Sequence, residues 1–94
     1  MITAAQMRAA RALLGIDQKT LAERAGVSVP TIQRMEASSG NVRGVVDSLT
    51  KVVEALSRSG IELIGEGAPS IGSGRGVRLR EPAASGGART GEQP

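Results

Sequence analysis

The sequence contains no cysteine, no histidine and no aromatic residue. Without cysteine, neither disulfide bonds nor thiolate metal sites can form. Without histidine, imidazole metal sites and imidazole acid–base catalysis are excluded, and the carboxylates show no closely paired set. Without aromatic side chains, no platform exists on which the bases of single-stranded RNA could stack. We therefore expect that the protein is not an enzyme and uses neither a metal ion nor a cofactor.

Long apolar runs are also missing. No stretch approaches the roughly 20 apolar residues of a membrane-spanning helix, and the start of the chain lacks the basic residues and apolar run of a signal peptide. We therefore expect a cytoplasmic protein with no membrane partner. The 94 residues suffice for one small domain. The net charge of +3 suits a polyanionic partner, although a solvated basic surface would give the same balance.

The first helix is predicted from its two ends. Thr3 and Gln6 form a capping-box pattern, so a helix should begin at Ala4, and Gly15 should end it. Two arginines are expected on its outer face, where a solvated role is favoured over phosphate contact: Arg8 and Arg11.

Residues 18–37 contain two short amphipathic helical patterns joined at Gly26. Asp17 is a good N-cap for the first helix and Ser28 for the second, and Gly26 can adopt the left-handed conformation that ends a helix. A turn this tight makes the two helices cross steeply, and the small Ala22 permits their close approach. The second helix is expected to turn Ile32 and Met35 inward and Gln33 and Arg34 outward.

This layout is that of a helix-turn-helix motif. Over about residues 3–60, the chain resembles the lambda-repressor/Cro-like family of helix-turn-helix proteins, also called the XRE family. The resemblance is carried by Leu14-Gly15-Ile16-Asp17-Gln18, Leu21-Ala22, Ala25-Gly26-Val27-Ser28, Thr31-Ile32 and Met35-Glu36. It implies a mainly α-helical bundle of four to five helices that binds double-stranded DNA. The alternative is an ordinary helical hairpin in a small all-helical domain.

The resemblance also assigns candidate contact residues. Those that would reach base edges in the major groove are Ser28, Val29, Pro30, Thr31, Gln33 and Arg34. Arg34 could pair bidentately with guanine and Gln33 with adenine, whereas Val29 and Pro30 offer apolar contact with thymine methyl groups. The candidates for contact with the DNA backbone are Gln18, Lys19, Ser38, Asn41 and Arg43.

A last amphipathic helix is predicted from about residue 45 to Gly60, which completes a DNA-binding domain over residues 1–60. Beyond it, residues 61–64 and 77–80 alternate apolar with charged side chains over most of their length, as half-buried strands do. The sequence therefore predicts a C-terminal β-hairpin over residues 61–80.

An isolated hairpin is marginal in water, so it must be covered. It can pack on its own bundle, or its edge can pair with a second copy of the chain; we favour the second copy. The residues expected at such a dimer interface are Ile61, Leu63, Ile64, Val77 and Leu79. A disordered tail with chance alternation is the alternative, and residues 81–94 are in any case expected to be disordered.

Together these patterns predict a transcriptional regulator that binds double-stranded DNA. We expect a homodimeric repressor that reads a palindromic operator, with a toxin or RNA polymerase as a possible protein partner. An antitoxin that represses its own operon is one alternative, with residues 61–94 binding the toxin. A pure protein-interaction module that does not bind DNA is another alternative.

Overall fold

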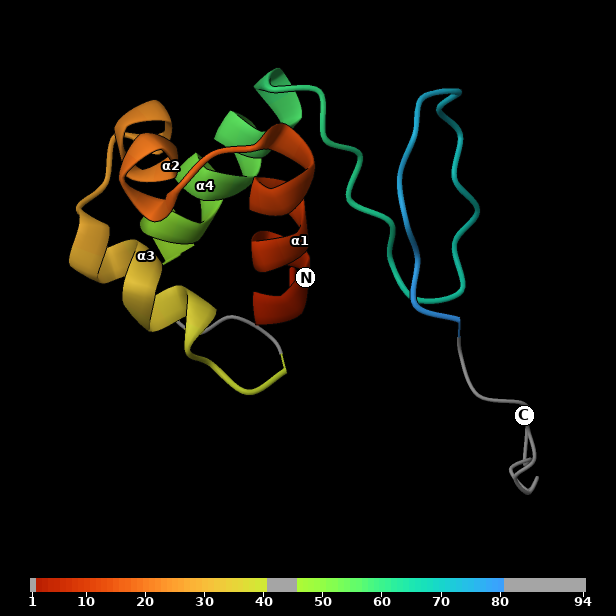
Figure 1. The fold of residues 1–94 in the computed structure, drawn as a ribbon. Coiled ribbons are helices and arrows are strands. Elements are labelled where there is room, and N and C mark those ends of the chain that lie inside the picture. Colours follow the sequence, from red (N-terminus) through yellow and green to blue (C-terminus); the bar gives the residue numbers. More distant parts are fainter. Residues whose placement is uncertain (1, 41–45, 81–94) are drawn as a thin grey trace.

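The computed structural model of the chain describes residues 2–40 and 46–80 (Figure 1). These two ranges contain four α-helices and no β-strand. The helices are α1 (Ala4–Leu14), α2 (Gln18–Ala25), α3 (Val29–Glu36) and α4 (Val46–Arg58). The mainly helical bundle predicted from the sequence is therefore confirmed, with four helices in the described part of the chain.

The helix ends lie where the capping residues predict them. Thr3 and Gln6 form a capping box, in which the backbone N–H of Thr3 donates to Gln6 Oε1 at 2.9 Å and the backbone N–H of Gln6 donates to Thr3 Oγ1 at 3.0 Å. Asp17 accepts from the backbone N–H of Thr20 at 2.8 Å. Gly15, with a φ of 68°, ends α1 in the left-handed conformation. Local sequence therefore determines where these helices start and stop.

One apolar core joins the four helices. In the described residues, α2 packs against both α3 and α4, and α1 packs against α3. The buried apolar residues are Ile2, Ala4, Met7, Ala10, Leu21, Ala22, Ala25, Ile32, Met35, Val52, Ala55 and Leu56. Five of them are alanines, which let the helices approach closely. Close packing of alanine and larger aliphatic side chains therefore holds α3 against its neighbours, and the sequence has no aromatic side chain to contribute.

The predicted C-terminal β-hairpin is wrong for the residues that the structure describes, because residues 61–80 contain no strand. Ile61 and Leu63 pack against the bundle core instead. Glu62 accepts hydrogen bonds from the backbone N–H groups of Ile71 at 2.8 Å and Gly72 at 3.0 Å. A side chain thus takes the donors that a strand ladder would use. The predicted disorder of residues 81–94 lies outside the described residues.

Within residues 2–40 and 46–80, no helix combines the length and the apolar character that a bilayer crossing requires.

Candidate nucleic-acid interface

The turn between α2 and α3 is short and tightly hydrogen-bonded. Gly26, with a φ of 73°, donates its N–H to Ala22 O at 2.9 Å, and Val27 donates to the same oxygen at 3.0 Å. Ser28 then caps α3 by accepting from the backbone N–H of Thr31 at 3.3 Å. α3 therefore leaves α2 at a fixed angle, as a helix-turn-helix motif requires.

The two faces of α3 differ sharply. Ile32 and Met35 are 0% and 1% exposed, whereas Gln33 and Arg34 between them are exposed. The apolar side anchors the helix in the core, so the polar side is held outward on a rigid element. This arrangement leaves two hydrogen-bonding side chains accessible to a groove of DNA.

The first turn of α3 carries the other candidates for base contact. Ser28 and Pro30 are exposed, whereas Val29 is half-buried and packs against the core. The hydroxyl groups of Ser28 and Thr31 are hydrogen-bonded at 2.8 Å, and Arg34 Nη2 donates to Thr31 Oγ1 at 3.3 Å. Pro30 is therefore better placed than Val29 for apolar contact with a base.

The candidates for backbone contact are placed unequally. Lys19 is exposed in the first turn of α2, whereas Gln18 is half-buried and donates from Nε2 to Glu36 Oε1 at 3.0 Å. Ser38 Oγ donates to Arg34 O at 3.3 Å, just beyond α3. Two candidates, Asn41 and Arg43, lie outside the described residues.

An ion pair between the partly buried Arg11 and the buried Glu36, which the sequence analysis missed, lies behind this surface. Glu36 at the end of α3 is 5% exposed, and its carboxylate accepts from Arg11 Nε at 2.7 Å and from Arg11 Nη2 at 2.8 Å. The predicted solvated role of Arg11 is therefore wrong. A signal was present, because Glu36 follows Ile32 by four residues and Met35 by one, and so falls beside the inward stripe of α3. A carboxylate there requires a cationic partner.

Arg8 and Arg11 of α1, together with Gln18 of α2, bind the end of α3. Arg8 Nη1 donates to Glu36 O at the C-terminal end of α3, where a cation is favoured by the helix dipole. Arg11 Nη1 donates to Ile16 O in the segment between α1 and α2 at 3.3 Å. With Gln18 from α2, these contacts hold the end of α3 against α1 and the start of α2, and so fix the direction in which α3 points.

The pKa of Glu36 reflects this balance. Burial raises it, but the hydrogen bonds from Arg11 and Gln18 and the charges of Arg11 and Arg8 outweigh burial, so the pKa of Glu36 lies below its ordinary value of 4.5. The pKa of Asp17 is also lowered, mainly by the hydrogen bond from the backbone N–H of Thr20. Both carboxylates are therefore held in the charged form.

These lowered pKa values predict the acid sensitivity of the fold. A carboxylate with a lower pKa in the folded chain contributes stability that is complete above its unfolded pKa and is lost as the pH falls through the folded value. We expect the thermal midpoint, followed by circular dichroism between about pH 6 and about pH 2, to fall below about pH 4.5. Asp17→Asn keeps an N-cap and removes one titrating group, so the thermal midpoint of this variant should still fall by most of the same amount. A midpoint that stays constant below about pH 4.5 would contradict this prediction.

Residues 7–44, which include α2, α3 and the turn between them, match the family model described as Helix-turn-helix. No curated protein and no solved structure gives a match. The matched family consists of DNA-binding regulatory domains and is not an enzyme family.

Proposed function

We propose that this DNA-binding transcriptional regulator is a homodimeric repressor of the lambda-repressor/Cro-like type that reads a palindromic operator. The match of residues 7–44 to the helix-turn-helix family model supports the proposal. The observation that carries the proposal is the two-faced α3, with Gln33 and Arg34 exposed beside the buried Ile32 and Met35. α3 is the second helix of the motif, the one that enters the major groove in such proteins.

The exposed side chains of α3 suit different bases. The guanidinium of Arg34 matches O6 and N7 of guanine, and the amide of Gln33 matches N6 and N7 of adenine. Pro30 offers apolar contact with a thymine methyl group at the start of the helix. Ser28 and Thr31 complete this base-reading face, whereas Val29 contributes mainly to packing.

Contacts with phosphate supply affinity without sequence preference. The exposed Lys19 and the first turn of α2 supply charge and backbone N–H groups beside α3. Gln18 also lies there, although its amide is engaged by Glu36. Ser38, Asn41 and Arg43 remain proposed contacts after α3. Because cations supply this part of the affinity, binding should weaken steeply as salt rises.

A homodimer places two copies of α3 in successive major grooves, about 34 Å apart on one face of the duplex. A palindromic operator follows from that two-fold symmetry. We propose repression rather than activation because occupancy of a promoter suffices for repression.

The test is selection of binding sites from a pool of random duplex DNA, followed by titration of the enriched site at rising salt. Enrichment of an inverted repeat with half-sites about one helical turn apart supports the proposal. The proposal fails if no sequence is enriched. It also fails if the chain does not bind duplex DNA at low salt, where phosphate contacts are strongest.

Arg34→Ala is expected to weaken binding to the selected site by about 1 to 3 kcal/mol and to relax the preference for guanine at one base pair. Arg75→Ala is the matched control, because it removes the same charge from an exposed position in the C-terminal region. That region and α3 lie on opposite sides of α1 (Figure 1). Fluorescence anisotropy with the selected duplex and with single-base variants measures both effects. If Arg34→Ala weakens binding to every duplex by the same amount, Arg34 does not read a base.

A further inference from the structure

A chain of hydrogen bonds joins three side chains on the outer face of α3. Arg34 Nη2 donates to Thr31 Oγ1 at 3.3 Å, and the hydroxyl groups of Thr31 and Ser28 are hydrogen-bonded at 2.8 Å. Ser28 Oγ also accepts from the backbone N–H of Thr31 at 3.3 Å, so the N-cap of α3 holds it in place. The guanidinium of Arg34 is therefore tied, through two hydroxyl groups, to the backbone at the start of its own helix.

Thr31 is placed to support Arg34 rather than to reach DNA itself. Thr31 is half-buried, whereas Arg34 is exposed. Helical side chains lean toward the N-terminus of their helix, so Arg34 extends back over Thr31 toward the first turn of α3. The first turn of a recognition helix is the part that contacts base edges. The bond to Thr31 therefore holds the guanidinium at the end of α3 where it is useful.

This bond leaves the guanidinium able to read guanine. A guanidinium has five N–H groups arranged as a fork, and Thr31 accepts from one of them. Whichever hydrogen of Nη2 is used, a parallel pair of N–H groups remains, either on Nη1 and Nη2 or on Nε and Nη2. One such pair is what O6 and N7 of guanine accept.

We propose that Thr31 is the positioning residue of Arg34: its hydroxyl, held by Ser28, orders the guanidinium before DNA binds and so strengthens the preference for guanine. An arginine side chain has a large rotamer entropy, part of which is lost when it binds a base. Ordering the side chain in advance reduces that loss. The inference rests on the base-reading role of Arg34 in the proposed function, and it assigns Thr31 to Arg34 instead of to a base of its own.

The first test removes the hydroxyl alone. Thr31→Val keeps the size and branching of the side chain, and the backbone N–H of residue 31 can still donate to Ser28. The preference for guanine at the base pair read by Arg34, measured by fluorescence anisotropy, should fall roughly 2- to 10-fold, as expected when one long side chain must be immobilised on binding. Thr31→Ser retains the hydroxyl and should retain the preference. Thr50→Val makes the same change at an exposed position of α4 and is the matched control.

A double-variant cycle separates positioning from direct contact. If Thr31 acts through Arg34, Thr31→Val should change binding to the selected duplex by less than about 2-fold once Arg34→Ala is present. A base contact made by Thr31 itself would instead give the same loss with and without Arg34. That result would overturn the proposal.

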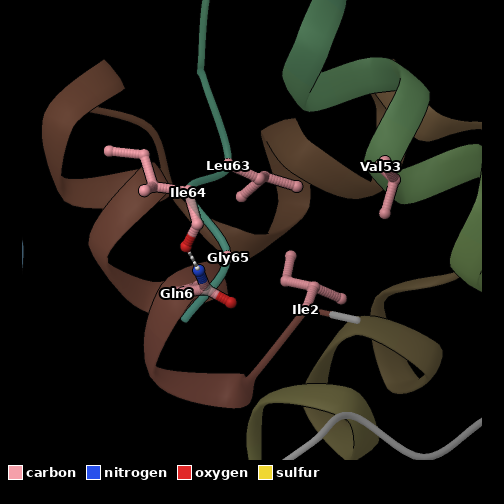
Figure 2. A pocket seen from close by; sticks show the side chains of 6 residues that line it. All are labelled: Ile2, Gln6, Val53, Leu63, Ile64 and Gly65. Carbon is pink, nitrogen blue, oxygen red and sulfur yellow. Dashed lines mark hydrogen bonds between the residues drawn. The ribbon is translucent and has the colours of Figure 1, made fainter. Parts of the chain in front are cut away.

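The ordering of Arg34 can be measured without DNA. The heteronuclear NOE of its Nε–H group in the free protein reports side-chain motion on the picosecond to nanosecond timescale. In the parent chain this NOE should exceed that of the exposed Arg75, and in Thr31→Val it should fall to the value of Arg75. The side-chain amide of Gln6, which donates to Ile64 O at 3.1 Å (Figure 2), is the internal reference and should not change.

These measurements distinguish failure of the inference from failure of the proposed function. An NOE of Arg34 that is equal in the parent chain and in Thr31→Val overturns the positioning role, whether or not the chain binds DNA. A more mobile Arg34 with an unchanged preference for guanine overturns the link to base reading. If the parent chain binds no duplex, the proposed function fails and the reading role of the pair fails with it, while the NOE still decides whether Thr31 orders Arg34.

Discussion

Arg11→Ala is expected to lower the free energy of unfolding by about 2 to 4 kcal/mol, because it removes the cationic partner of a buried carboxylate although Arg11 itself is only partly buried. Glu36 is 5% exposed and would lose the two hydrogen bonds from Arg11 that compensate for its burial. Small domains have only about 5 to 15 kcal/mol in total. Urea unfolding followed by circular dichroism, with linear extrapolation to water, measures the loss.

The matched control removes both charges. Arg11→Met combined with Glu36→Met replaces the pair by apolar side chains of similar size, and such replacements are often close to neutral in stability. The double variant should therefore be more stable than Arg11→Ala. A loss below about 1 kcal/mol for Arg11→Ala would be that of a surface ion pair, and would show that Arg11 does not compensate for the burial of Glu36.

The ion pair connects stability to the proposed function. Glu36 ends the helix that carries Gln33 and Arg34, and its carboxylate is held by α1 through Arg11 and by α2 through Gln18. A loosened end of α3 would let the base-reading face change direction. We therefore expect Arg11 to affect DNA binding through the orientation of α3, without contacting DNA itself.

The parts of the fold that could be predicted from sequence depend on short-range contacts. Thr3 with Gln6, Asp17 with Thr20 and Ser28 with Thr31 are each three residues apart, so helix starts follow from local spacing. The inward and outward residues of α3 follow from helical periodicity in the same way.

The ion pair could not be predicted in that way. Arg11 and Glu36 are 25 residues apart, and their contact exists only after α1 and α3 have packed. Periodicity placed Arg11 on the outer face of α1, and it could not indicate that the end of α3 covers part of that face.

The C-terminal region shows the limit of alternation as a signal. Residues 61–64 and 77–80 both have the pattern of strands, but their apolar residues differ in burial. Leu63 packs on the bundle, whereas Leu79 stays exposed. Glu62, charged and exposed in the predicted strand, binds the backbone of residues 71 and 72. Alternation therefore identified apolar segments that need a partner but not the hydrogen bonds that they form.

Ile32→Ala is expected to reduce stability and Gln33→Ala to reduce DNA binding, because these neighbours lie on opposite faces of α3. Ile32 is 0% exposed, so its truncation should lower the free energy of unfolding by about 2 to 5 kcal/mol through lost burial and the cavity left behind. Gln33 is exposed, so its truncation should change stability by no more than about 0.5 kcal/mol. It should nevertheless weaken binding to the selected duplex and relax the preference for adenine at one base pair.

Urea unfolding measures the stability of the two variants, and fluorescence anisotropy measures their binding to the selected duplex. Together they distinguish a residue that anchors α3 in the core from one that reads a base. Below its unfolding transition, Ile32→Ala should keep the base preference of the parent chain, because its exposed face is unchanged. If Gln33→Ala destabilises the fold as much as Ile32→Ala, the outer face of α3 is part of the packed bundle. The helix would then have no free face to present to DNA, and the base-reading role of Arg34 would fail with it.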